Sequence, residues 1–198
     1  YLATSNKPEP MRFPVDCFKK EFSAKKDVES ARLYATACGI YSAYINGEKV
    51  SMPLAPGVTD YRKRVQYQTY DVTDLIKENN IINIDLADGW YRGSCGAWGL
   101  KNQYGCETKI LAQLEIQYID GSTDTVITDS SWLWSNDGSV RFADNKDGEI
   151  VDANKVPTYY TRAKLTLHNV VPSASNNVPI AEKETFKGEM TTAPSGKK

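Results

Sequence analysis

A glycine-rich segment at residues 86–100, LADGWYRGSCGAWGL, gathers the residue types in this chain that could do chemistry. Its candidate ligand-contacting residues are Asp88, Trp90, Tyr91, Arg92 and Trp98. The carboxylate and the guanidinium can hold hydroxyl groups by charge-assisted hydrogen bonds, and the aromatic rings offer flat apolar faces. Rings beside a few convergent polar groups are typical of small-ligand sites. One interpretation of the segment is therefore a platform on which a sugar ring stacks.

The same residues also fit a purely structural role. Continuing the apolar alternation of residues 82–86 places Asp88 on the core-facing row at the end of a strand. A carboxylate there is costly unless it is hydrogen-bonded, ion-paired or bound to a metal, and Arg92 is the candidate partner. In this interpretation the pair ties a loop to the rim of the fold, and Trp90 fills the end of the core. The residue types alone leave both interpretations open.

A second loop, SMPLAPGVTDYRKRVQYQTYD, adds Asp60 and Tyr61 as candidate sugar contacts, although its basic run also fits an ordinary solvated face. The chain needs no cofactor, but some of its carboxylates could bind Ca²⁺, which prefers oxygen ligands. These are Asp60, Asp88, Asp144 and Asp147. Their spacing matches no calcium loop, so the metal ligands stay unassigned.

The sequence offers no catalytic constellation. It contains no G-x-S-x-G, no phosphate-binding loop, and only one histidine, His168. A glycosidase needs two carboxylates across a cleft, and the scattered acidic residues indicate no such pair. No C-x-x-C motif is present, so a zinc site is not expected. Cys38 is expected in the core, whereas Cys95 and Cys106 could form a disulfide in an oxidising compartment.

Composition excludes several classes of partner. The 198 residues carry a formal net charge of −1, which gives no electrostatic reason to expect nucleic acid or an anionic membrane. No apolar run approaches the length of a membrane span, and the first residues do not resemble a signal peptide. The chain does not begin with Met, so we expect it to be part of a longer protein.

Period-two alternation predicts strands over most of the chain. In SARLYATAC the small apolar residues share one face, and the strand continues towards an Asn46-Gly47 pair that predicts a type I′ hairpin turn. The segment YDVTDLIKEN predicts a short helical turn capped by Asp71, and no other segment carries a helical pattern.

A second hairpin is predicted about Asp120-Gly121 in LAQLEIQYIDGSTDTVIT. A two-residue turn there would place two sets of residues on one face: Leu114, Ile116 and Tyr118 with Thr123, Thr125 and Ile127. Further turns are predicted at 136–138 and 147–148. Together these patterns predict an all-β fold, an antiparallel two-sheet β-sandwich of jelly-roll (galactose-binding-like) type with one or two short helical turns.

The pattern also suggests domain boundaries. Residues 1–14 are expected to form an N-terminal extension, and 15–168 the β-sandwich. Residues 169–198 are polar and rich in Pro, Ser and Asn, and we expect a linker or the start of a following β-domain.

Six segments, in order along the chain, resemble the N-terminal β-sandwich domain of bacterial α-L-rhamnosidases. They are SARLYATACGIYSAYINGEKV, LAPGVTDYRKRVQYQTYDVTDLI, NIDLADGWYRG, ILAQLEIQYIDGS, TDSSWLWS and DGEIVDA. The resemblance covers most of residues 15–155. The YxNG and YDVTDLI elements also resemble jelly-roll domains of other glycosidases, such as β-galactosidases. The combination of APGxTDYRKRVQYQTYDVTD with DGWYRG is more specific to the rhamnosidases.

The resemblance implies an accessory domain of a multidomain hydrolase that releases terminal α-L-rhamnose with inversion. The acid and base carboxylates of that family lie in a downstream (α/α)₆ barrel, so no catalytic residue carries over to this chain. The implied partners are the barrel, the other β-domains of the same polypeptide and rhamnose-containing glycosides, with calcium in some related modules. The matching positions are Asp60, Tyr61, Asp88, Trp90, Tyr91 and Arg92. The segment SCGAWGLKNQYGC departs from the family pattern, which puts a ligand pocket there in question.

Two alternatives stay open at this point. The chain could be an autonomous carbohydrate-binding module, or a jelly-roll domain of another glycosidase.

Overall fold

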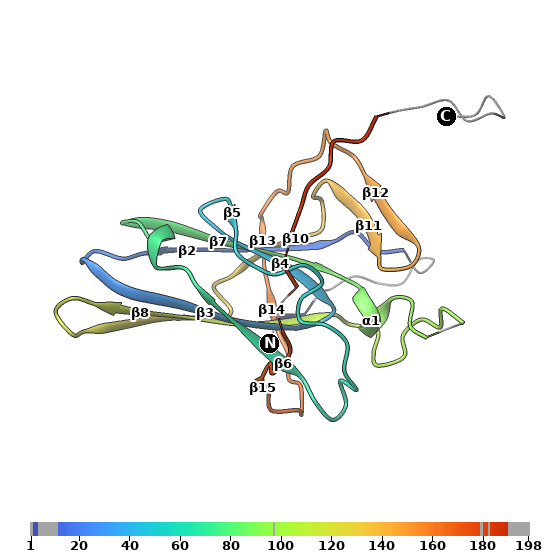
Figure 1. Ribbon diagram of the computed structural model, residues 1–198, viewed down its shortest axis with the longest axis horizontal. Helices are drawn as coiled ribbons and strands as arrows, with labels where there is room; N and C mark the ends of the chain where they lie inside the picture. The colour runs from blue at the N-terminus through green and yellow to red at the C-terminus, as the bar shows by residue number, and fades with distance from the viewer. Residues whose placement is uncertain (1, 4–11, 97, 179, 182, 190–198) are drawn as a thin grey trace.

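Two β-sheets pack face to face in a sandwich, and a small hairpin covers one end (Figure 1). The computed structural model describes residues 2–3, 12–96, 98–178, 180–181 and 183–189. Most of the expected N-terminal extension and the last nine residues therefore lie outside the described residues. Within the described part, no helix is long and apolar enough to cross a membrane.

The first sheet has seven strands in the order β14-β1-β8-β3-β6-β15, with β9 paired to β8. The strands are β1 (Leu2–Ala3), β3 (Val28–Cys38), β6 (Gln66–Asp71), β8 (Lys109–Tyr118), β9 (Thr123–Ile127), β14 (Lys164–Leu165) and β15 (Ser173–Ala174). All neighbours are antiparallel except β6 and β15, which are parallel.

The second sheet has six strands in the order β13-β10-β2-β7-β4-β5, all antiparallel. The strands are β2 (Asp16–Ser23), β4 (Ile40–Ile45), β5 (Glu48–Lys49), β7 (Asn79–Ala87), β10 (Leu133–Ser135) and β13 (Thr161–Arg162). The remaining elements are the hairpin β11 (Val140–Asp144) and β12 (Gly148–Val151), the 3₁₀ turn η1 (Thr73–Leu75) and the helical turn α1 (Gly89–Arg92). The predicted all-β sandwich is confirmed.

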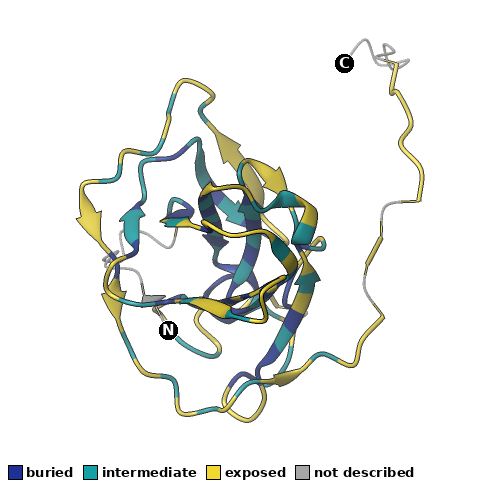
Figure 2. Cartoon of the chain, turned by 90° about the vertical axis from the view of Figure 1, so that its left-hand side faces the viewer, coloured by how far each residue is buried: buried dark blue, intermediate teal, exposed yellow. Residues whose placement is uncertain are grey.

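The core forms because apolar residues alternate along both sheets. On β7, Ile82, Ile84 and Leu86 are each at most 1% exposed, and on β3 the small residues and Leu33 face them across the sandwich. Trp132 is completely buried among them. Each buried aliphatic side chain contributes roughly 1.5–3 kcal/mol to the hydrophobic stabilisation. Figure 2 shows buried residues gathered on the sandwich strands, whereas the described residues after 175 are exposed.

Both local signals predicted in the first half of the chain are found, the second of them with a different capping residue. Asn46 and Gly47 have φ values of 52° and 88°, as the hairpin between β4 and β5 requires. The predicted helical turn is the 3₁₀ turn η1, but its N-cap is Val72 and not Asp71. The Asp71 side chain, one residue earlier, accepts a hydrogen bond from the backbone N–H of Thr73 at 3.1 Å. The sequence showed no helical pattern at α1, which is a single turn of four residues.

The predicted facing of the second hairpin is wrong by one residue. Gln117 pairs with Thr123 and Gln113 with Ile127, so Val126 and Asp124 stand opposite Leu114 and Ile116. The backbone N–H of Tyr118 donates to Ser122 O, and Gly121 has a φ of 81°. The loop thus has three residues and ends in a left-handed glycine, which shifts the pairing relative to a two-residue turn.

A segment that we call the strap, residues 161–174, connects the two sheets. It begins as β13 at the edge of the six-stranded sheet, then forms β14 at one edge of the seven-stranded sheet and β15 at another. Its His168 ring nitrogen Nε2 lies 3.0 Å from the carbonyl oxygen of Tyr61.

All four cysteines are free thiols. Cys38 is buried, as expected for a core residue, and Cys17 is buried as well. Cys95 is half-buried and Cys106 is exposed, and they are not bonded to each other.

Candidate functional site

The rim of the sandwich, where β7 runs into α1, contains a buried ion pair. Asp88 directly follows β7 as the N-cap of α1, and Arg92 lies one helical turn later, so the two side chains meet. Arg92 Nε donates to Asp88 Oδ1 at 2.7 Å, and Arg92 Nη2 lies 2.6 Å from the same oxygen. The two residues are only 3% and 2% exposed. Burial raises the pKa of Asp88, and the positive charge of Arg92 opposes that rise.

A second buried carboxylate, Asp16 of β2, completes this cluster. Its Oδ2 lies 3.9 Å from Arg92 Nη2, and its Oδ1 accepts a hydrogen bond from Trp134 Nε1 at 2.9 Å. Burial raises the pKa of Asp16 to about 7, although Arg92 counteracts it. The guanidinium also lies over the ring of Phe13, 4.0 Å from its centre.

Sequence reasoning missed Asp16, although a signal was present. Asp16 and Phe18 are two residues apart on one strand and therefore share a face, and Phe18 is completely buried.

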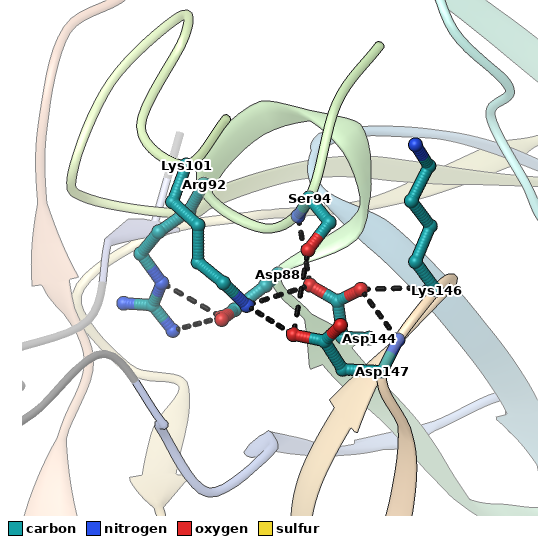
Figure 3. A network of polar contacts seen from close by, with 7 residues as sticks. All are labelled: Asp88, Arg92, Ser94, Lys101, Asp144, Lys146 and Asp147. Atoms are coloured by element: carbon teal, nitrogen blue, oxygen red, sulfur yellow. Dashed lines mark hydrogen bonds and ion pairs between the residues drawn. The ribbon is translucent and has the colours of Figure 1, made fainter. Parts of the chain in front are cut away.

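A second polar network joins the loop after α1 to the β11–β12 hairpin (Figure 3). Asp144 Oδ2 accepts from the backbone N–H of Ser94 at 2.7 Å and pairs with Lys101 Nζ at 3.3 Å. Its Oδ1 accepts from the backbone N–H groups of Lys146 at 2.8 Å and Asp147 at 3.1 Å. Burial pushes the pKa of Asp144 up, but these donors outweigh it and hold the pKa below its ordinary value.

Three tyrosines form an aromatic cluster beside α1. The rings of Tyr61 and Tyr91 meet edge to face with centres 5.3 Å apart, and Tyr61 contacts Tyr104 in the same way at 5.1 Å. Tyr61 is 1% exposed and Tyr91 5%, and Trp90 packs half-buried against the same cluster. Burial raises the pKa of Tyr91 to about 12. Tyr104 was not predicted, because it follows a glycine-rich stretch without periodicity.

The remaining two predicted residues are Asp60 and Trp98. Asp60 is half-buried and accepts from Arg62 Nε at 2.9 Å, an interaction that lowers the pKa of Asp60. Trp98 is 90% exposed on the loop after α1.

The structure therefore separates the seven predicted residues by accessibility. Asp88 and Arg92 form one buried pair, and Tyr61 and Tyr91 lie in the buried aromatic cluster, so these four fix the shape of the rim. Asp60, Trp90 and Trp98 keep surface that a ligand can touch. Among the described residues, no three His, Cys, Asp or Glu side chains are grouped to hold a metal ion.

Comparison with known proteins gives one consistent result. A family model described as the alpha-L-rhamnosidase N-terminal domain matches residues 26–191. An alpha-L-rhamnosidase of Streptomyces avermitilis is 44% identical over 162 residues, covering 78% of this chain and 15% of that protein. One of Formosa agariphila is 42% identical over 150 residues, covering 72% of this chain and 16% of that protein. The chain thus spans about 15% of the length of these relatives.

Solved structures with a similar fold are also alpha-L-rhamnosidases. The S. avermitilis alpha-L-rhamnosidase complexed with L-rhamnose superimposes with a TM-score of 0.74 at 38% identity, covering 80% of this chain and 16% of that one. The alpha-L-rhamnosidase of Aspergillus terreus superimposes with a TM-score of 0.72 at 37% identity, covering 77% of this chain and 18% of that one.

Proposed function

Because the chain belongs to the α-L-rhamnosidase N-terminal domain family, we propose that it is the accessory N-terminal domain of a larger α-L-rhamnosidase. The whole protein would hydrolyse terminal α-L-rhamnosides, and this domain would support its catalytic barrel. The observation that carries the proposal is the family match over residues 26–191, in a chain that spans about 15% of its relatives' length.

The rim supports a scaffolding role. Ion pairs and ring contacts hold α1 and its loop in place. They are made by the Asp88–Arg92 pair, Asp16 and the tyrosine cluster. Trp98 and Leu100, 90% and 53% exposed, then project from a loop that is held in place. Exposed apolar side chains on a fixed loop are what a neighbouring domain of the same polypeptide would cover.

Sugar handling at the rim is the finer part of the proposal. Trp98 and Trp90 would offer the stacking surface, and Asp60 would accept hydrogen bonds from sugar hydroxyls, whereas Asp88, Tyr61, Tyr91 and Arg92 would hold the rim in shape. Calcium would enter only if sugar binding at the rim required the ion.

Activity tests the first part. We expect the 198-residue chain to release no nitrophenol from p-nitrophenyl α-L-rhamnoside, whereas a longer polypeptide that contains it does. Hydrolysis by the chain alone would contradict an accessory role. Cleavage of a β-galactoside in place of the rhamnoside by the longer polypeptide would favour a domain of another glycosidase.

Calorimetric titration of the chain with L-rhamnose, with calcium and again with a chelator, tests the second part. We expect saturable binding that Trp98→Ala weakens and that Tyr160→Ala, at a residue 91% exposed elsewhere, does not. Loss of binding with the chelator would place the ion in the site. Absence of heat at millimolar rhamnose would leave the scaffolding role alone.

A further inference from the structure

The outer face of the seven-stranded sheet carries a groove of about 590 Å³ that shares no lining residue with the rim. The lining residues that matter for a ligand are Tyr34, Tyr67, Gln113, Glu115, Ile127 and Thr128. They come from β3, β6, β8, the end of β9 and the residue that follows it, and Pro172 of the strap adds to the wall. Ligand sites in proteins fall in this range of volume.

Strand register places the polar groups of the groove in one row. Tyr34 stands opposite Gln113, and Gln113 stands opposite Ile127, so the three side chains share the outward face. Glu115 is two residues from Gln113 on that face, and Gln113 Nε2 donates to Glu115 Oε1 at 2.7 Å. This bond leaves the amide oxygen of Gln113 and Oε2 of Glu115 as neighbouring acceptors.

The two tyrosines give the groove an aromatic surface. The Tyr34 and Tyr67 rings meet edge to face with centres 6.0 Å apart at 72°, and both residues are half-buried. The contact holds each ring in place while part of it stays accessible. A fixed aromatic ring packs against the C–H face of a sugar at little entropic cost.

The charge of the lining narrows the chemical class of the ligand. Glu115 is the only charged residue among the described residues that line the groove. Acceptors, aromatic surface and the absence of a cation in the lining favour a neutral polyhydroxylated ligand over an anion.

We propose that this groove is a second carbohydrate site, which binds a neutral oligosaccharide. It crosses four strands, about 14 Å at the usual strand spacing, which is longer than one sugar ring. A sugar would pack on the tyrosine rings while two of its hydroxyls donate to Gln113 and Glu115. The inference goes beyond the accessory role, because such a glycan can dock here whichever bond the whole protein cleaves.

Calorimetry with five neutral pentasaccharides, built on glucose, xylose, mannose, galactose or rhamnose, tests the proposal on the 198-residue chain. At least one should bind with one site per chain. Tyr34→Ala and Gln113→Ala should each weaken that binding about tenfold or more, equal to about 1.4 kcal/mol. Tyr160→Ala is the matched control, because it removes an exposed tyrosine outside the groove and should leave the affinity unchanged.

Substitutions in the groove test oligosaccharide binding there independently of rhamnose binding at the rim. Gln113 is exposed, so its substitution tests the groove even if Tyr34→Ala unfolds the chain. Binding that Gln113→Ala leaves unchanged, or heat from none of the five pentasaccharides at millimolar concentration, would overturn the groove proposal. Neither result would touch the rhamnosidase assignment, which the activity of the longer polypeptide decides.

Discussion

Arg92 shows how one residue can organise a rim. It is 2% exposed, yet its guanidinium faces two carboxylates, Asp88 and Asp16, and an aromatic ring. A buried cation is tolerable only with such partners, and each buried carboxylate in turn depends on the cation. Above about pH 7, where Asp16 is ionised as well, the three charges form a unit whose members cannot be removed singly without cost.

Above about pH 7, Arg92→Ala should lower the free energy of unfolding by about 3–5 kcal/mol, because the buried carboxylates of Asp88 and Asp16 then lose their counter-charge. Urea denaturation followed by tryptophan fluorescence measures the change. Arg62→Ala is the control, since its pair with Asp60 is largely solvent-exposed and its loss should hardly move the midpoint. Equal midpoints for the two variants would show that the buried pair does not stabilise the rim.

The sequence predicts the Asp88–Arg92 pair but not the other groups around Arg92. The alternation along β7 is enough to predict that Asp88, the next residue, is buried. A spacing of four residues is enough to predict that Arg92 is its partner. Asp16 comes from a strand that is distant in sequence, and its contact with Arg92 depends on how β2 pairs with β7. Nor could residue types separate the buried Tyr61 from the exposed Trp98, because both occur in loops.

Among the elements, α1 depends on a close approach of two backbones. Gly89 has a φ of 52°, and a Cβ there would lie 2.7 Å from Ile40 Cγ1 and 2.8 Å from the Ile40 backbone nitrogen. Because β4 lies against this turn, neither side has room to move.

Gly89→Ala should therefore destabilise the fold more than Gly96→Ala, by about 1–3 kcal/mol. Gly96 also has a positive φ, 66°, but no atom lies within 4 Å of its added Cβ. Both variants carry the left-handed backbone cost of about 1–2 kcal/mol, so their difference isolates the contact with Ile40. Thermal melts compare them, and similar melting temperatures would contradict the packing argument.

The errors in the predicted elements have identifiable causes. A dipeptide such as Asp120-Gly121 fits a two-residue turn or the end of a three-residue loop, and only strand pairing distinguishes the two. The short strands of the strap have two residues each, too few for any periodicity to appear. Long alternating strands such as β3 and β7 were predictable because burial on one face dictates their residue types.

For the whole molecule, the buried carboxylate of Asp16 links stability to pH. Its pKa is raised from 3.8 to about 7 by burial, so the folded chain keeps a proton that the unfolded chain has already released. The stability that this proton contributes is fully present below about pH 4. It is lost as the pH rises to about 7.

Asp16→Asn should remove this dependence. We expect the free energy of unfolding of the parent, relative to that of the variant, to fall between pH 4 and pH 7 in urea titrations at several pH values. The comparison cancels groups common to both proteins, such as His168, whose pKa is lowered by burial. Asp120→Asn is the control, because a hydrogen bond from Lys26 lowers the pKa of Asp120, which therefore acts below pH 4. A constant difference between parent and Asp16→Asn would refute the link.

The strap has a mechanical consequence. Its three strands, β13, β14 and β15, have two residues each and attach to both sheets. Tension applied through residues beyond 175 would load β15 first, then β14, then β13. Each would yield after only a few hydrogen bonds, so the long strands β3, β7 and β8 would bear force only after the strap had peeled away.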